Sequence, residues 1–181
     1  MIAGAAVSAQ FAAIAVLAAE TWELVETSRV GLPAQSPGGP HYRSGLMAFT
    51  LGPALLQAFE RIRSRADVAI FRAHGIAHPR RCGMAAHLGL LLEVPSVGCA
   101  DTLLCGEYGR PGPQRGDWTP VTAGGDIVGG AVRTRQGSRP VFVSPGYGMG
   151  IQEAVGMALR CTVRSRLPEP LRVARLVARG A

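Results

Sequence analysis

The chain has 181 residues, of which 48% are hydrophobic and 17% charged, so it can bury a sizeable core and is too apolar to be intrinsically disordered. Its formal net charge is +7, and every one of its 19 basic residues is an arginine. Because the planar guanidinium binds phosphates through two parallel hydrogen bonds, an arginine-rich surface suits nucleic acid or another polyanion. The alternative is that the base composition of the genome favours arginine codons, which would give the same count without that function.

Two apolar stretches, 2–9 and 11–19, open the chain and predict consecutive strands joined by a tight link near Gln10. No positive residue precedes them and polar residues interrupt them, which favours core strands over the alternative of a signal peptide. Residues 21–30 alternate apolar and polar side chains, as in a half-exposed third strand of an antiparallel meander. Residues 31–45, rich in Pro, Gly and Ser, predict a long loop.

A helix is expected to begin at Pro53, where a missing N–H is tolerated. Apolar residues then recur at helical spacing, and arginines follow in the last turn, where the helix dipole favours cations. The apolar residues are Leu55, Leu56, Phe59 and Ile62, and the arginines are Arg61, Arg63 and Arg65.

The next segments predict a strand at 66–71, a buried helix at 83–93 and a strand at 95–100. This order is a parallel βαβ unit with a right-handed crossover. Ligands of parallel sheets bind beyond the carboxyl ends of the strands, so Arg72 and the basic loop after it are a candidate site.

The rest of the chain predicts a loop, short strands and two helices, with no internal repeat and no linker. We therefore expect one domain, 1–181, with an α/β, ribonuclease H-like mixed sheet of three antiparallel strands followed by parallel strands, flanked by helices. The expected segments are a loop at 101–116, strands at 118–122, 127–135 and 141–143, a helix at 151–164, a break at 167–170 and a helix at 171–179.

The four cysteines show no CxxC pair and no histidine at zinc spacing. They are expected to be free thiols in a reducing cytosol, which indicates a cytoplasmic protein. These residues are Cys82, Cys99, Cys105 and Cys161.

Several patches along the chain resemble the endonuclease V family, whose members nick DNA or RNA near inosine, the product of adenine deamination. The resemblance runs from Ile2 to about Arg175 and implies the ribonuclease H-like fold. The family also has a segment before its first strand, and we expect this chain to be a version without it. The patches are Ile2–Ala5, Gly45–Phe49 with Gly52–Pro53, Asp67–Arg80, Ala86–Gly89, Val94–Gly98, Phe142–Gly146 and Leu167–Pro170.

The resemblance implies that carboxylates hold Mg²⁺ or Mn²⁺ at three positions, where this chain has Ala6, Leu51 and Arg72. It also implies a lysine where Asp101 stands and a histidine where Tyr147 stands. We therefore expect no intact catalytic site, no metal and no cofactor. The alternatives are an active endonuclease V with a metal site rebuilt around Asp101, and a non-enzymatic interaction or structural role.

Arg72 and Asp101 follow two strands that should be parallel neighbours. We hypothesise that they form an ion pair across the former metal site. The alternative is that both side chains point into solvent.

The residues that the resemblance assigns to binding are retained. Tyr42 occupies the position of an aromatic wedge that opens the strand, and a glycine-containing loop corresponds to the pocket for a flipped base. The alternatives are a structural histidine at position 78 and a solvated face for the two arginines. The partner expected is DNA or RNA, possibly containing inosine, for a monomer that does not associate with membranes. The predicted contacts are Tyr42, Gly75, Ile76, His78, Arg80 and Arg81.

Overall fold

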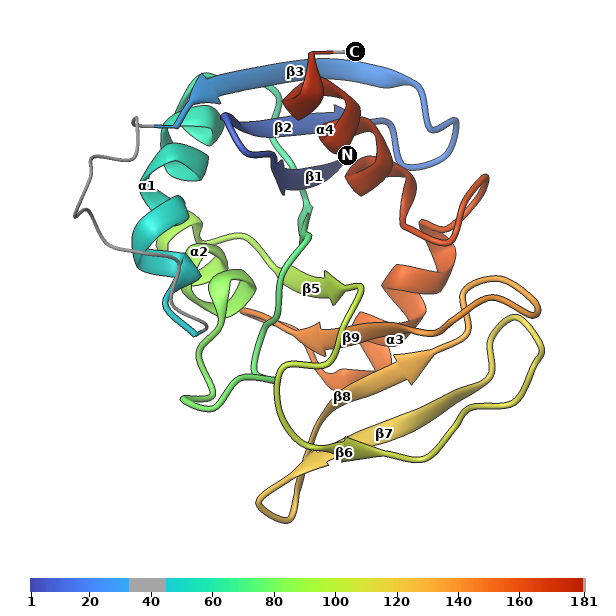
Figure 1. The fold of residues 1–181 in the computed structure, drawn as a ribbon. Coiled ribbons are helices and arrows are strands. Elements are labelled where there is room, and N and C mark those ends of the chain that lie inside the picture. Colours follow the sequence, from blue (N-terminus) through green and yellow to red (C-terminus); the bar gives the residue numbers. More distant parts are fainter. Residues whose placement is uncertain (33–44, 181) are drawn as a thin grey trace.

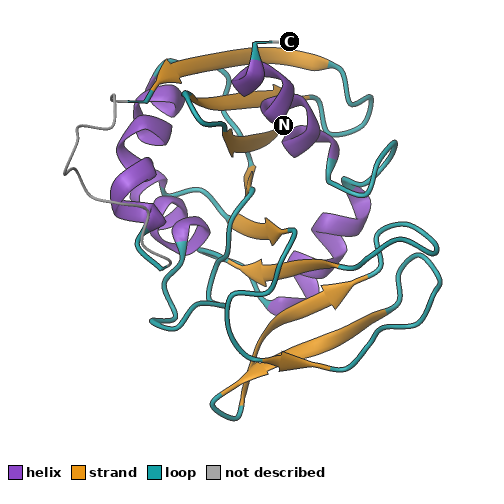
Figure 2. Cartoon of the chain, in the orientation of Figure 1, coloured by secondary structure: helices purple, strands orange, loops and turns teal. Residues whose placement is uncertain are grey.

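The computed structural model describes residues 1–32 and 45–180. Within them one mixed sheet runs in the order β3-β2-β1-β4-β5-β9-β8-β7-β6, with helices on both sides (Figure 1, Figure 2). The elements are β1 (Ile2–Val7), β2 (Phe11–Leu17), β3 (Leu24–Gly31), α1 (Met47–Glu60), β4 (Val68–Phe71), α2 (Met84–Leu92), β5 (Ser96–Ala100), β6 (Glu107–Tyr108), β7 (Trp118–Ala123), β8 (Asp126–Val132), β9 (Val141–Pro145), α3 (Ile151–Arg160) and α4 (Glu169–Arg179).

The strand directions confirm the predicted ribonuclease H-like order. Strands β1, β2 and β3 form an antiparallel meander, and β1, β4 and β5 run parallel, with α2 as the crossover between the last two. Beyond β5 the sheet becomes antiparallel through β9, β8, β7 and β6. Three parallel strands therefore end side by side at one edge.

The helices divide between the two faces of the sheet (Figure 1). On one face α1 and α2 cover a core that includes Ala3 and Ala5 of β1. On the other face α4 packs on β1 and β2, and α3 packs on β5, β8 and β9. The small side chains of β1 let α4 approach closely, since a Cβ at Gly4 would overlap the backbone of Pro170.

Helix α1 begins earlier than predicted, at Met47 rather than at Pro53. Gly45, with φ of +82°, turns the chain into the helix, and Met47 packs against the core from its first turn. These apolar contacts outweigh the loss of one helical hydrogen bond at Pro53. The helix ends at Glu60, so Arg63 lies beyond it, where its backbone N–H donates to the Glu26 carboxylate at 3.0 Å.

The predicted break at 167–170 is instead the start of α4. Pro168 is the N-cap and Pro170 lies in the first turn, where proline is tolerated. Glu169 is buried there, and Arg172 binds both of its oxygens, at 3.0 and 2.7 Å. Helix α3 correspondingly ends at Arg160 rather than at residue 164.

Smaller differences follow from local hydrogen bonds. Strand β1 stops at Val7, because the Ser8 hydroxyl accepts the N–H of Phe11 at 3.0 Å and closes a turn. The short strand β6 lies inside the segment predicted as a loop, paired with β7. No helix in residues 1–32 and 45–180 is long and apolar enough to cross a membrane.

The close packing of α4 on β1 predicts that Gly4→Ala lowers the free energy of unfolding by about 3 kcal/mol, since the added methyl must displace backbone. The matched control is Gly156→Ala in the middle of α3, where an added Cβ meets open space. That change should raise the free energy of unfolding by about 1 kcal/mol through helix propensity. Urea unfolding measures both, and equal effects would contradict this packing.

Candidate functional site

The candidate site lies where β1, β4 and β5 end. Ala6 is buried in β1, Arg72 follows β4 directly, and Asp101 follows β5 directly. The backbone N–H of Arg72 donates to the Ala5 carbonyl at 3.0 Å, which brings Arg72 level with the end of β1. The topology thus gathers these three positions at one edge of the sheet.

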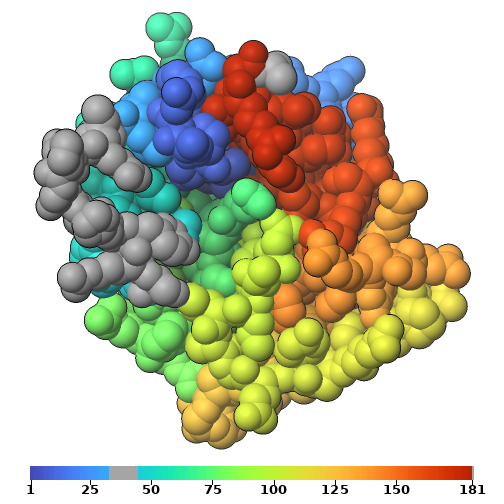
Figure 3. Space-filling model, viewed as in Figure 1, coloured from blue at the N-terminus to red at the C-terminus, as the bar shows by residue number. Residues whose placement is uncertain are grey.

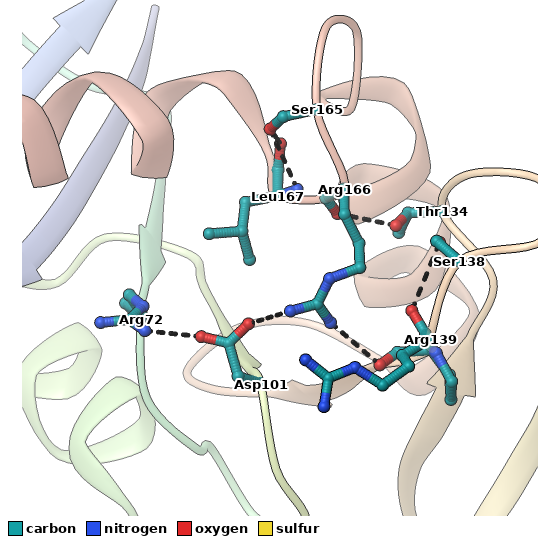
Figure 4. A network of polar contacts seen from close by, with 9 residues as sticks. Arg72, Asp101, Thr134, Ser138, Arg139, Ser165, Arg166 and Leu167 are labelled. Carbon is teal, nitrogen blue, oxygen red and sulfur yellow. Dashed lines mark hydrogen bonds and ion pairs between the residues drawn. The ribbon is translucent and has the colours of Figure 1, made fainter.

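Asp101 is held between two arginines (Figure 4). Arg72 Nη2 lies 2.6 Å from Asp101 Oδ2, and Arg166 Nη2 donates to the other oxygen, Oδ1. The predicted Arg72–Asp101 ion pair is therefore confirmed. Sequence reasoning missed Arg166. Its guanidinium donates to the Pro140 carbonyl at 3.2 Å, and its backbone carbonyl accepts a hydrogen bond from the Thr134 hydroxyl at 2.7 Å.

The environment of Asp101 favours its ionised form. Burial raises the pKa of the carboxyl, but hydrogen bonds and positive charge from Arg72 and Arg166 outweigh burial and hold the pKa below its ordinary value of 3.8. The side chains of the three residues are 23 to 31% exposed, so solvent screens them only in part. Both carboxylate oxygens are committed to guanidinium groups.

This set of side chains does not fit a divalent metal ion. Mg²⁺ and Mn²⁺ bind oxygen ligands, and Asp101 would have to exchange two charged hydrogen bonds for one weak coordination. In the described part of the chain, no group of three or more His, Cys, Asp or Glu residues is placed to hold a metal ion. With two guanidinium groups and one carboxylate, the cluster carries a net positive charge, which disfavours a cation.

Two of the predicted positions form no polar contact with this cluster. Leu51 is packed against the α1–α2 core. Tyr147 lies at the opposite end of β5, where its backbone N–H donates to the Ser96 hydroxyl at 2.8 Å and its carbonyl accepts the Ser96 N–H at 2.9 Å. The structure therefore does not bring Tyr147 together with Arg72 and Asp101.

The loop after Arg72 is pinned to the end of β9. The N–H of Gly75 donates to the Ser144 hydroxyl, and that of Ile76 to the Pro145 carbonyl, both at 2.8 Å. Only glycine fits at position 75, because a Cβ there would overlap the Pro145 carbonyl. His78 is buried and its Nδ1 accepts the N–H of Arg80 at 3.1 Å, so this ring also orders the loop.

The two arginines of this loop differ in availability. Arg80 is exposed, and its guanidinium makes one long contact of 3.5 Å to the Gly45 carbonyl. Arg81 is bound to the β7–β8 turn through an ion pair of 3.2 Å with Asp126. Tyr42, the predicted wedge, lies outside the described residues.

A cavity of about 300 Å³ adjoins Arg72 and Asp101, between the start of α1, the loop after β4 and residues 100–104. His78 and Phe49 are among its lining residues, and the Phe49 side chain is exposed. His74 also lines it; burial, and secondarily the nearby His78, lower the pKa of His74 to about 4, so that ring is neutral at pH 7. A neutral ring in a mostly apolar hollow can both donate and accept hydrogen bonds.

The bridge at Asp101 predicts that Asp101→Asn lowers the free energy of unfolding by about 2 kcal/mol at pH 7, because two half-buried guanidinium groups lose their counter-charge. Since the pKa of Asp101 is lowered in the folded state, this contribution is complete above its ordinary value of 3.8 and disappears as the pH falls through the folded pKa. Urea unfolding between pH 3 and pH 7 measures the difference.

The matched control is Asp126→Asn, which removes the exposed partner of Arg81. Because that carboxylate is 79% exposed, the change should cost less than about 0.5 kcal/mol. A loss for Asp101→Asn that is no larger than the control, or that persists unchanged at pH 3, would contradict the bridge.

Comparison with known proteins places this geometry in a family. A model of the endonuclease V family matches residues 1–176. Endonuclease V of Trichormus variabilis is 42% identical over 163 residues, covering 90% of this chain and 72% of that protein. The crystal structure of endonuclease V from Streptomyces avermitilis is 34% identical with a TM-score of 0.89, covering 99% of this chain and 79% of that chain. The human catalytic domain is 30% identical with a TM-score of 0.86, covering 99% and 80%. The chain therefore belongs to the endonuclease V family.

Proposed function

We propose that this protein binds a nucleic-acid strand containing a deaminated base and does not cleave it by the metal-dependent chemistry of its family. The observation that carries the proposal is the state of Asp101. It is the carboxylate at the ends of β1, β4 and β5, and Arg72 and Arg166 take both of its oxygens. The resemblance implies carboxylates at three positions that hold Ala6, Leu51 and Arg72 here, and none of these side chains offers a metal ligand.

Relatives support the nucleic-acid part of the proposal. Endonuclease V of Ciona intestinalis, 21% identical with a TM-score of 0.81, has been solved in complex with a 23-mer DNA containing an inosine followed by a ribo-adenosine. This chain carries a net charge of +7, and all 19 of its basic residues are arginines. Arginine contacts to phosphates position a strand without reading its sequence.

The cavity beside the Arg72–Asp101 pair supports the base-binding part. An enzyme or binder that reads a single damaged base takes it out of the stack into a tight pocket. The cavity of about 300 Å³ is large enough for one base, and the exposed ring of Phe49 at its wall offers a stacking surface. The neutral His74 ring adds a polar group that can meet the edge of a base.

The proposal predicts binding without nicking. With Mg²⁺ or Mn²⁺ present, an inosine-containing strand should stay intact while a gel shift reports its binding, and binding should weaken as salt rises. The matched strand has adenosine in place of inosine and should bind more weakly.

Metal-dependent nicking that Asp101→Asn abolishes would instead identify an active enzyme with a rebuilt site. Absence of binding to either strand at low salt would favour an interaction or structural role.

The cavity predicts that Phe49→Ala weakens binding of the inosine strand by about tenfold, because one stacked ring is worth about 1–3 kcal/mol. The folded protein should tolerate the change, since the Phe49 side chain is 67% exposed. The aromatic control is Tyr108→Ala, whose ring packs edge-on against Phe142 with centroids 5.0 Å apart, away from the cavity. Equal losses in the two variants would contradict binding of a base in this cavity.

A further inference from the structure

A second hollow lies on the α4 side of the same edge. It is a groove of about 430 Å³ between the β1–β2 turn and the last two turns of α4, and Arg72 is one of its lining residues. Figure 3 shows the face on which the N-terminal residues, in blue, adjoin the C-terminal helix, in red. Two further arginines line the groove, Arg175 and Arg179.

The groove is strongly positive. None of its lining residues carries a carboxylate. In residues 1–32 and 45–180, neither Arg175 nor Arg179 forms an ion pair or a side-chain hydrogen bond, and the Nε of Arg175 is buried without a partner. The single negative charge of Asp101 is shared between Arg72 and Arg166, so it offsets the positive charge of Arg72 only in part.

Placing these arginines together has a cost in the absence of an anion. Burial, followed by the positive charges of Arg72 and Arg179, lowers the pKa of Arg175. The free carbonyl groups at the carboxyl end of α4 carry a partial negative charge of about half an electron, which repels an anion. The Ser8 hydroxyl donates a hydrogen bond to one of them, the Ala178 carbonyl, at 2.8 Å. The charges of Arg175 and Arg179, with the part of the Arg72 charge that Asp101 does not offset, exceed this partial charge.

We propose that the groove is a phosphate site, in which a phosphate oxyanion binds among Arg72, Arg175 and Arg179. Guanidinium forks match the geometry of a phosphate through paired hydrogen bonds. The ends of β1 and β4, where the family resemblance places a metal ion, then hold a strand phosphate directly by protein charges. That the phosphate belongs to a nucleic-acid strand rests on the proposed function; the anion site itself does not.

The test titrates inorganic phosphate into the protein in the presence of a metal chelator, followed by isothermal calorimetry. Phosphate should bind at one site, and Arg175→Gln should weaken it by about tenfold, as expected for loss of a charge-assisted hydrogen bond. The control is Arg65→Gln, an exposed arginine just before the amino end of β4, at the opposite edge of the sheet, and it should leave phosphate binding unchanged.

Thermal unfolding without phosphate is the second measurement. Because Arg175 lacks an ion-pair partner and is repelled by its neighbours, Arg175→Gln should leave the Tm unchanged or raise it. A Tm that falls, or equal loss of phosphate binding in Arg175→Gln and Arg65→Gln, would overturn the site. So would the absence of phosphate binding in the wild-type protein.

The source of the phosphate is tested separately with a single-stranded oligonucleotide. If the strand binds and Arg175→Gln weakens it by about tenfold, the groove holds a strand phosphate. If phosphate binds through Arg175 but no strand binds, the anion site stands and the proposed function fails. If the strand binds equally to the wild type and Arg175→Gln, nucleic-acid binding stands and its assignment to this groove is overturned.

Discussion

The ion-pair bridge Arg72–Asp101–Arg166 is the constraint on which the candidate site depends. It joins the ends of β4 and β5 to the segment between α3 and α4, so that one carboxylate links the parallel strands to the C-terminal part of the chain. Because both oxygens of Asp101 are used, no carboxylate among residues 1–32 and 45–180 is free at this edge of the sheet for a divalent cation. The same bridge leaves the surrounding charge positive.

At two positions the charge is opposite to the one that the family resemblance implies: Arg72 stands where a carboxylate is implied, and Asp101 where a lysine is implied. An endonuclease V-like edge that carries carboxylates attracts a cation, which in turn meets the phosphate backbone. Here Arg72 stands where the resemblance implies a carboxylate and, with Arg175 and Arg179, lines the groove that we propose as a phosphate site. A cation-binding edge promotes hydrolysis, whereas an arginine-lined edge favours binding alone. The proposed binding of a base in the cavity beside it requires no metal ion.

Much of the fold could be predicted from the sequence, because apolar runs, the βαβ spacing and the family patches all indicate the same order of elements. The Arg72–Asp101 pair was predictable, since both residues directly follow parallel neighbouring strands. Arg166 and Arg175 were not, because they come from distant segments whose orientation depends on tertiary packing. Tyr147 was grouped with the site because the resemblance implies a histidine there, and the antiparallel direction of β9 instead places it beside Ser96, at the start of β5. The helix boundaries predicted near Pro53 and Pro170 were wrong. A proline fits the first turn of a helix, but its presence does not show at which residue the helix begins.

The central claim is that this edge of the sheet no longer holds a divalent metal ion. The most direct measurement is the electron paramagnetic resonance signal of free Mn²⁺ during titration into the purified protein. The account predicts that the signal follows a protein-free control up to millimolar Mn²⁺, since Asp101 stays bound to its two arginines. Loss of signal equivalent to one bound ion per chain, reversed by Mg²⁺ and absent in Asp101→Asn, would contradict it.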